Sequence, residues 1–563
     1  MINNKRQKLR AGIVVIAILV LVVVMAVMFL IVRYTPTKEK MDGYQYFEIE
    51  KQSQKVLVIV DGERYPDTGE YIEGRLYIPI SFVEDNINTR FYYDKESDGV
   101  MYSDQSHVYL FSPSENKYTD DAGKSYDMDY PVVEKSGNEC YVEWEYIADH
   151  TECIYEYGSE PSRVNITLAG DTEQCVTAAK KLAVRYKGGI KSPVLETVPK
   201  GTRLVWEDDL DDWVKVTTPS GMTGYVKKAD VSEQFEYIPE GNYTEESRNV
   251  DNNGKITLGW FQVASAAGNA YVDNYTGSAS GLNVISPTWY SISNASGEVT
   301  SYASAAMVSK MHAQGIKVWP LVNDFDKNID YEALFSSRTA REKLTDTLIS
   351  DAVKNGYDGI NLDFENVKSS YAKDFLQFVR ELSVQCAKAG LVLSTDNYKP
   401  EAYNRCYNLA EQSAFVDYII IMAYDEHYAG SDAGSVASLQ FVKEAVEDTL
   451  KDVPSGQLIV GIPFYTRIWT TSGGQTTSKA VSMQAALDQL NSDGQTALWN
   501  DDCGQYVASY AVGNSTRQIW FEEEKSIEAK MQLIQGNNTA GVACWKLGLE
   551  KTTVWPVINK YNK

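Results

Sequence analysis

Two carboxylic acids and an amide alternate with apolar residues in the stretch Tyr357–Glu365. With a two-residue period, Asn361, Asp363 and Glu365 share one face of a strand. Because such groups are costly to bury without partners, we expect this face to look into a cavity. A proton donor with a second carboxylate beside it could then perform general acid catalysis. The alternative interpretation is a half-exposed edge strand with an acidic outer face.

The sequence around this strand alternates strands with amphipathic helices, which predicts a parallel sheet. Eight strands are expected, at residues 256–262, 282–291, 317–323, 359–365, 392–397, 418–424, 458–464 and 541–547. Predicted helices over 307–314, 341–355 and 372–389 each end at a glycine. This pattern fits a (β/α)8 TIM barrel. A doubly wound open sheet is the alternative, but no glycine-rich phosphate turn follows the first strand.

In a barrel of this kind, catalytic groups lie at the carboxyl ends of the strands. The predicted ends carry mainly aromatic and acidic residues: Trp260, Gln262, Trp289, Tyr290, Trp319, Asn323, Asp363, Glu365, Asp396, Tyr398, Met422, Tyr424, Asp425, Phe464, Tyr465 and Trp545. Aromatic rings that stack on sugars, together with a proton donor, suit a polysaccharide substrate. Any one ring alone is more often core packing. No histidine pair accompanies the acids, so neither a metal nor another cofactor is expected.

Four segments resemble motifs of the family 18 glycoside hydrolases, which include chitinases and endo-N-acetylglucosaminidases. Asp358–Glu365 resembles the signature DGxDxDxE, and Met422–Asp425 resembles the motif of strand six. Gly461–Tyr465 and Trp545 resemble the motifs of strands seven and eight. The likeness covers residues 254–563 in the right order, and the layout is most similar to bacterial wall- and spore-associated members.

The resemblance implies substrate-assisted hydrolysis with retention. Glu365 would protonate the glycosidic oxygen while the acetamido oxygen of the substrate attacks the anomeric carbon. Asp363 would hold the acetamido N–H, Tyr424 its oxygen, and Trp545 the face of the sugar. The resemblance and the predicted strand ends together name these substrate-binding residues: Asp358, Asn361, Met422, Asp425, Tyr465, Trp545, Trp289 and Trp260.

Asn361 departs from the family pattern, because chitinases usually have Asp at this position. An amide cannot share a proton with Asp363, so the coupled titration of two neighbouring acids is lost there. It can still donate a hydrogen bond. We therefore expect an altered pH profile and retained activity, with crystalline chitin in doubt as the substrate.

The N-terminus reads as a membrane anchor. Four basic residues lie among residues 1–10, and an uncharged apolar run follows over 11–32, long enough to span a bilayer. The basic segment should stay in the cytoplasm as a tail, which places the later domains outside at the cell membrane. A cleaved signal peptide is the alternative, but no small-residue cleavage site ends the run.

Three segments connect the anchor to the barrel. A linker is expected over 33–54, followed by a small α+β domain over 55–169 whose repeat, offset by 64 positions, aligns Tyr77 with Tyr141. Each copy reads as a strand, a short helix and a hairpin. Residues 76–102 loosely resemble the copper amine oxidase N-terminal-like domain, without implying copper, and we interpret the repeat domain as a spacer or docking domain.

Residues 172–233 resemble a bacterial SH3 domain, a small β-barrel. The likeness rests on the runs Val194–Thr202, Trp213–Val216 and Gly221–Val226. Such domains usually bind cell-wall peptides or act as spacers. A polar linker is expected over 234–253, ahead of the barrel.

Composition limits the partners. The net charge of -24 argues against nucleic acid, which needs a basic surface. The seven cysteines are scattered, and Cys140 could pair with Cys153, although isolated buried thiols are favoured.

Together these features predict a membrane-anchored, extracytoplasmic hydrolase of β-1,4-linked N-acetylglucosamine glycans, either peptidoglycan or chitin-like. The alternative is a non-catalytic protein that binds amino sugars or the cell wall. The presence of Glu365 favours the enzyme, because an inactive relative would be expected to have lost this acid.

Overall fold

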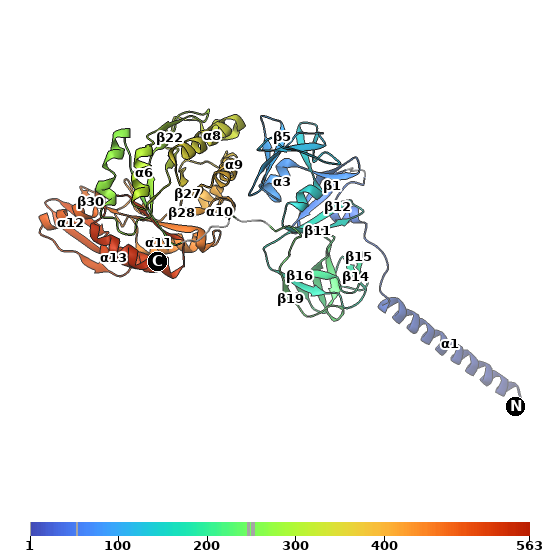
Figure 1. The fold of residues 1–563 in the computed structure, drawn as a ribbon. Coiled ribbons are helices and arrows are strands. Elements are labelled where there is room, and N and C mark those ends of the chain that lie inside the picture. The colour runs from blue at the N-terminus through green and yellow to red at the C-terminus, as the bar shows by residue number, and fades with distance from the viewer. Residues whose placement is uncertain (1, 52–54, 245–247, 249–253, 563) are drawn as a thin grey trace. The chain divides into compact units, whose positions relative to one another are not determined.

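The computed structural model describes residues 2–51, 55–244, 248 and 254–562, so the linker expected over 234–253 lies partly outside the described residues. The chain forms two compact units (Figure 1). One comprises Met1–Asn88 and Pro131–Glu245, and the other comprises Thr89–Tyr130 and Glu246–Lys563. The segment Thr89–Tyr130, which the sequence placed within the α+β domain, therefore belongs to the C-terminal unit. The other predicted boundaries remain predictions.

The first helix, α1 (Ile2–Tyr34), contains the whole apolar run over 11–32. It is long and apolar enough to cross a membrane, and its side chains are exposed along its length. Membrane spans and signal sequences share these properties. The structure therefore shows one long apolar helix at this position.

The N-terminal unit contains two seven-stranded sheets. The order of the first is β11-β12-β1-β2-β3-β10-β9, in which β1 (Lys55–Val60) pairs in parallel with β12 (Arg163–Leu168). Its other strands are β2 (Glu63–Ile72), β3 (Arg75–Pro79), β9 (Val133–Ser136), β10 (Glu139–Glu143) and β11 (Cys153–Gly158). In sequence, β3 leads to the helix α3 (Ile80–Asn86), and β10 leads to α4 (Trp144–Asp149). Each helix is followed by a hairpin, and the repeat domain itself remains a prediction. The copper amine oxidase likeness remains a prediction.

The second sheet is the SH3 region. Its order is β15-β14-β18-β17-β16-β13-β19, and neighbouring strands run antiparallel. The strands are β13 (Glu173–Thr177), β14 (Leu182–Arg185), β15 (Val194–Val198), β16 (Arg203–Leu210), β17 (Trp213–Thr217), β18 (Thr223–Lys227) and β19 (Phe235–Tyr237). Val184, Leu204 and Val216 are fully buried in its core.

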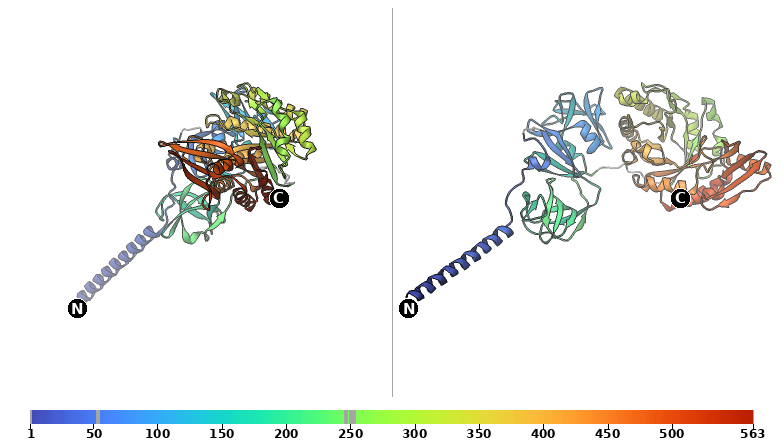
Figure 2. Two further views of the ribbon diagram at one scale, coloured as in Figure 1. Left: turned by 90° about the vertical axis from the view of Figure 1, so that its left-hand side faces the viewer. Right: turned by 180° about the vertical axis from the view of Figure 1, so that it is seen from behind.

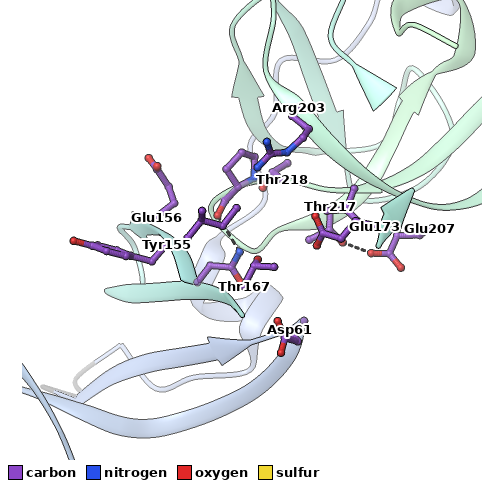
Figure 3. Close-up of a pocket in the computed structure, with 14 residues that line it drawn as sticks. Asp61, Tyr155, Glu156, Thr167, Glu173, Arg203, Glu207, Thr217 and Thr218 are labelled. Atoms are coloured by element: carbon purple, nitrogen blue, oxygen red, sulfur yellow. Dashed lines mark hydrogen bonds between the residues drawn. The ribbon is translucent and has the colours of Figure 1, made fainter. Parts of the chain in front are cut away.

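A cleft of about 310 Å³ lies between these two sheets (Figure 3). Its charged lining is mostly acidic, with Asp61, Glu156, Glu173 and Glu207 facing a single arginine, Arg203. None of its lining residues belongs to the catalytic candidates. Cys140 and Cys153, in the first sheet, are both buried and form no disulfide with each other.

The C-terminal unit is built on a curled parallel sheet (Figures 1 and 2). Its parallel segments are β20 (Ile256–Phe261), β21 (Val284–Pro287), β22 (Tyr290–Ile292), β24 (Lys317–Val318), β25 (Leu321–Asn323), β26 (Gly359–Asp363), β27 (Val392–Tyr398), β28 (Tyr418–Met422), β29 (Leu458–Pro463) and β35 (Gly541–Trp545). A short strand, β23 (Val299–Ser301), pairs antiparallel with β22. All eight predicted strands correspond to these segments, although two of them are each split into two pieces. The first strand, β20, pairs with both β21 and the last strand, β35.

Helices pack on the outer face of this sheet and form one large apolar core. They include α6 (Ala305–Ala313), α7 (Tyr331–Ser336), α8 (Arg338–Asn355), α9 (Ala372–Ala389), α10 (Leu409–Phe415), α11 (Leu439–Thr449), α13 (Glu524–Gly536) and α14 (Trp555–Tyr561). The glycine that ends α8, Gly356, has a φ of 75°, a left-handed conformation that suits glycine at a helix end.

A five-stranded antiparallel sheet is inserted between β29 and β35, in a part of the chain where no element was expected. It contains β30 (Tyr465–Ser472), β31 (Gln475–Ser482), β32 (Leu498–Asn500), β33 (Gln505–Val512) and β34 (Ser515–Phe521), with α12 (Met483–Ser492) between β31 and β32. It is orange to red in Figures 1 and 2. A fully buried ion pair between Glu522 and Lys530, with a closest distance of 2.8 Å, joins its last strand to α13.

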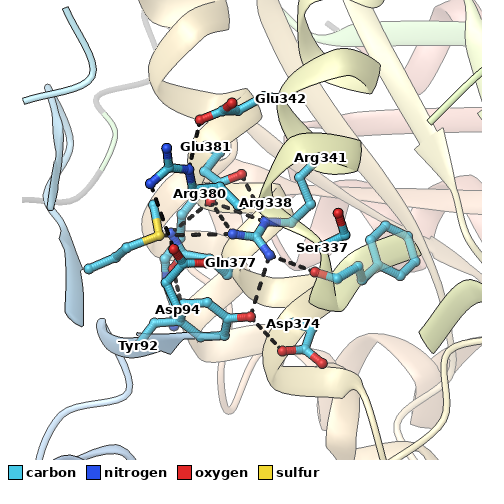
Figure 4. A network of polar contacts seen from close by, with 12 residues as sticks. Tyr92, Asp94, Ser337, Arg338, Arg341, Glu342, Asp374, Gln377, Arg380 and Glu381 are labelled. Atoms are coloured by element: carbon cyan, nitrogen blue, oxygen red, sulfur yellow. Dashed lines mark hydrogen bonds and ion pairs between the residues drawn. The ribbon is translucent and has the colours of Figure 1, made fainter. Parts of the chain in front are cut away.

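The segment Thr89–Tyr130 folds as a second five-stranded sheet that packs on α8 and α9. Its strands are β4 (Phe91–Asp94), β5 (Gly99–Ser103), β6 (Val108–Phe111), β7 (Lys117–Asp120) and β8 (Ser125–Asp127). Tyr92 donates a hydrogen bond to Asp374 at 2.6 Å and lies 3.4 Å from the guanidinium of Arg341 (Figure 4). Glu96 accepts a hydrogen bond at 3.0 Å from the backbone of Thr339, in the first turn of α8. This sheet is therefore part of the unit that carries the catalytic candidates.

Candidate active site

Strand β26 divides its side chains between two environments, as the two-residue period predicted. Ile360 and Leu362 point outward and belong to the apolar core beneath the helices. Asn361 and Asp363 point inward, and both are buried. The strand ends at Asp363, so Glu365 lies two residues beyond it, in the loop at the carboxyl end of the sheet.

The amide of Asn361 is fully hydrogen-bonded. Its Oδ1 accepts from Trp260 Nε1 at 3.1 Å and from Ser286 Oγ at 2.9 Å. Its Nδ2 donates to Ser394 Oγ at 3.1 Å and to Asp396 Oδ1 at 2.7 Å. A side-chain amide has two N–H donors and one oxygen that can accept two hydrogen bonds, so Asn361 uses its full capacity. An ionised aspartate at this position could not donate to Asp396.

Two neighbouring strands hold Glu365 in place. The carboxylate of Asp324, just after β25, accepts hydrogen bonds from the backbone N–H groups of Glu365 and Asn366, both at 2.9 Å. The hydroxyl of Tyr398, at the end of β27, donates to Glu365 Oε2. Backbone and carboxyl group are thus positioned independently.

The surroundings of Glu365 raise the pKa of its carboxyl group. Burial is the largest cause, and the negative charges of Asp324 and Asp425 act in the same direction. The hydrogen bond from Tyr398 opposes them by favouring the ionised form. A carboxyl group with a raised pKa keeps its proton closer to neutral pH, as a general acid must.

Asp363 is the more deeply buried of the two acids, and burial raises its pKa well above the usual range. The nearby carboxylates of Asp396 and Glu365 add to this effect. Among the described residues, its Oδ1 has no hydrogen-bond partner. Since buried polar atoms are nearly always paired, this oxygen is suited to accept a donor from a ligand.

Aromatic rings stand beside the acids. The ring centroids of Trp260 and Trp545 are 5.7 Å apart, and Tyr424 lies 6.4 Å from Trp260 and from Tyr465. Tyr424 and Trp545 are partly exposed, whereas Trp260 is buried. The hydroxyl of Tyr465 donates to Asp425. The exposed rings can therefore contact a sugar, and Trp260 supports them and Asn361 from below.

The structure does not bring two of the predicted substrate-binding residues to this site. Asp358 precedes β26, at the opposite end of the strand from Asp363, where it accepts a hydrogen bond from the Val318 backbone at 2.8 Å. Trp289 is buried in the outer core, and its Nε1 donates to Asn269 at 2.8 Å. Met422 ends β28, at the carboxyl edge of the sheet, and is buried.

Three residues of the site received no role from the sequence: Asp324, Asp396 and Tyr398. Two of them carried a signal, because Asp396 and Tyr398 follow Ser394 with a period of two and thus share a face of β27. Asp324 lies directly after a predicted strand. Carboxylates are common in such loops, so this position alone did not indicate a role.

Two family models match this chain. The family model described as glycosyl hydrolases family 18 matches residues 222–550, more than half of the chain. The model described as bacterial SH3 domain matches residues 180–232.

Curated relatives match the C-terminal region. The protein named uncharacterized glycosylase YvbX of Bacillus subtilis is 26% identical over 281 residues, 47% of this chain and 81% of the relative. The cortical fragment-lytic enzyme of Bacillus subtilis is 27% identical over 236 residues, 40% of this chain and 54% of the relative. The chain thus spans about half the length of the second relative.

Among solved structures, the C-terminal domain of a candidate chitinase from Desulfitobacterium hafniense DCB-2 matches with a TM-score of 0.51 and 22% identity. The match covers 55% of this chain and all of that domain, and it supports the fold alone.

Proposed function

The chain belongs to the glycosyl hydrolases family 18, and from this membership we propose that it cleaves β-1,4 bonds in glycans that contain N-acetylglucosamine. One observation carries the proposal: Glu365, with its raised pKa, lies two residues beyond the buried Asp363, whose Oδ1 has no partner among the described residues. One acid can supply a proton while the other receives the acetamido group.

The steps follow from these two positions and from the substrate. Glu365 gives its proton to the glycosidic oxygen, and the acetamido oxygen of the sugar attacks the anomeric carbon as the bond to the leaving group breaks. Asp363 accepts the acetamido N–H and balances the positive charge of the oxazolinium ion. Tyr424 hydrogen-bonds the acetamido oxygen, and Trp545 lies against the sugar ring. Glu365 then takes a proton from the water that opens the oxazolinium.

The same proposal includes the finer points of architecture. The pairing of β20 with β35 supports a closed (β/α)8 barrel, whose carboxyl end holds the acids. The apolar helix α1 supports a single-pass anchor that leaves the later domains outside the cell membrane. An SH3 domain supports contact with the cell wall, and the name of the relative described as cortical fragment-lytic is compatible with a peptidoglycan substrate. Chitin-like oligomers fit the same chemistry.

Hydrolysis by the full-length protein in detergent tests the proposal. We expect N-acetyl-chito-oligosaccharides, purified peptidoglycan or both to be cut, with new products in the mass spectrum. Proton NMR of the first product should show the β-anomer, because attack by the acetamido group and then by water inverts the anomeric carbon twice. Binding without hydrolysis of any amino-sugar polymer would instead favour the non-catalytic carbohydrate-binding function. An α-anomer would exclude the substrate-assisted route.

The anchor makes a separate prediction. Cell fractionation should leave the full-length protein in the membrane, and protease added to intact, wall-stripped cells should degrade the C-terminal unit. N-terminal sequencing can contradict the anchor: a soluble protein that starts near residue 30 would identify α1 as a cleaved signal peptide.

A further inference from the structure

Asn361 and Asp396 form a matched pair in the interior of the sheet. The amide at position 361 donates to Asp396 Oδ1 at 2.7 Å, the shortest of its four hydrogen bonds. Asp396 is 3% exposed and lies on the neighbouring strand, β27. The chain therefore has an amide where the family signature has a carboxylic acid, and a buried carboxylic acid next to that amide.

Asp396 also lies beside Asp363. In the parallel pairing of β26 with β27, Asp363 is the register partner of Asp396. Register partners in a parallel pair point to the same face, and adjacent strands are about 4.8 Å apart. Burial raises the pKa of Asp396, and the hydrogen bond from the amide of Asn361 opposes this rise by favouring the ionised form. Two carboxyl groups this close and this buried hold one proton between them.

We propose that Asp396 is a positioning residue that exchanges a proton with Asp363, supplying from β27 the second carboxyl group that the family signature has at the position of Asn361. This inference rests on the proposed function, because it gives Asp363 its role towards the acetamido group. It explains the departure at Asn361, since an amide there donates to Asp396 and an aspartate would repel it.

The proton balance is internal. Before substrate binds, Asp363 holds the shared proton and Asp396 is ionised. When the acetamido N–H donates to Asp363, that proton moves to Asp396, so Asp363 is ionised when the oxazolinium charge forms. Because Asp396 Oδ1 already accepts from Asn361, we assign the transferred proton to Oδ2. No proton enters or leaves the protein, and release of the product reverses the transfer.

The charged and titratable groups facing this pair are nearly all acidic. Glu365 after β26, Asp324 after β25 and the phenol of Tyr424 after β28 act on Asp363 or Asp396. Tyr398 on β27 is neutral and is engaged with Glu365. Because so many acids lie close together, repulsion between their negative charges disfavours ionising both Asp363 and Asp396. Sharing one proton between the two has the lower free energy.

Three full-length variants separate this role from a merely structural one. Asp396→Asn keeps the size of the side chain and an oxygen that can accept from Asn361, but it cannot take a proton. Asn361→Asp/Asp396→Asn moves the carboxyl group to the position used by the family while the total charge is unchanged. Asp417→Asn is the control, a half-buried carboxyl group before β28 that pairs with Arg248 at 3.0 Å and accepts from the Leu393 backbone at 2.7 Å.

Kinetics give the first measurement. Asp396→Asn should lower kcat by about 10²-fold, the low end for loss of a proton-transfer partner, with little change in KM. The acidic limb of its kcat profile should move to higher pH, because Asp363 must then release its proton to solvent. The double variant should regain most of the lost kcat, and Asp417→Asn should keep the original profile. If Asp396→Asn is folded and keeps the kcat and the profile of the unmodified enzyme, the inference is wrong.

Calorimetry gives a second measurement that needs no turnover. In a Glu365→Gln background, an N-acetylglucosamine oligomer is titrated in two buffers of different ionisation enthalpy. Binding should release close to no protons, whereas addition of Asp396→Asn should raise the release towards about one proton per ligand at weakly acidic pH. Asn361→Asp/Asp396→Asn in the same background should return the proton release towards zero.

The two measurements also separate the inference from the proposed function. Proton release that follows the prediction in a protein without hydrolytic activity would support the shared proton and overturn only the proposed hydrolysis. Hydrolysis by the unmodified chain, with equal proton release in all variants, would overturn only the role of Asp396. Failure of the Glu365→Gln protein to bind any such oligomer would overturn both.

Discussion

Replacing Glu365 by Gln should lower turnover on N-acetylglucosamine oligomers by a factor of about 10² to 10⁴, the range that general acid catalysis contributes. The amide has the size of the acid and can still accept from Tyr398, but it has no proton to give to the leaving oxygen. Oligomer binding should survive, because Asp363, Tyr424 and Trp545 still hold the acetamido group and the ring. Initial rates and a binding titration on the same preparation measure the two effects separately.

The control for Glu365→Gln is Glu447→Gln, the same substitution on the exposed face of α11, where Glu447 faces Lys443 at 3.7 Å. It should leave turnover unchanged. The pH profile of the unmodified enzyme supplies a further check. Because Glu365 acts in its protonated form and its pKa is raised, activity should persist above the ordinary range of a glutamate and fall as pH rises through that pKa. Near-normal hydrolysis by Glu365→Gln would show that another group is the acid.

The features that could be predicted from the sequence are local ones. The alternation of Ile360 and Leu362 with Asn361 and Asp363 is a property of one strand, and it correctly separated the core face from the inner face. Helix ends at glycines are equally local, as Gly356 shows with its positive φ. The eight strands were found because each is a short apolar run bounded by turns or helices.

The features that could not be predicted depend on register and on distant partners. The partnership of Asp396 with Asp363 exists only through the pairing of β26 with β27. Trp289 lies near the end of a predicted strand, yet it is buried in the outer core, where Asn269, 20 positions earlier, accepts its indole hydrogen bond. Asp358 matches the family signature, but a strand separates it from the acids it was grouped with.

The position of the segment Thr89–Tyr130 is another long-range feature, and it leads to the prediction with the largest effect on stability. Arg341 on α8 is fully buried, and it donates to the carboxylate of Glu381 on α9 at 2.9 and 3.0 Å (Figure 4). It also donates to the carbonyl of Phe335 at 2.7 Å. Tyr92 and Met101 from the small sheet cover the pair, with Met101 Sδ 3.9 Å from the guanidinium.

Arg341→Leu should lower the free energy of unfolding of the C-terminal unit by about 3–5 kcal/mol, the usual cost of breaking a buried ion pair from one side. The leucine fills part of the space but leaves Glu381, which is 11% exposed, as a buried charge without its cation. Urea unfolding followed by tryptophan fluorescence measures the change. The control is Lys343→Leu on the same helix, whose ion pair with Glu298 is about half exposed and should be worth less than about 1 kcal/mol.

The same contacts change what is expected of a shortened protein. On sequence alone, a chain that starts near residue 253 should fold and keep its activity on soluble oligosaccharides. Such a chain lacks Tyr92 and Met101, so Arg341, Glu381 and the buried Val384 would face water. We therefore expect it to unfold at lower urea concentration than the full-length protein, and Arg341→Leu to cost less in it, because water can then reach Glu381. Equal costs of Arg341→Leu in the two backgrounds would mean that the small sheet does not seal the ion pair, and that the unit is complete without it.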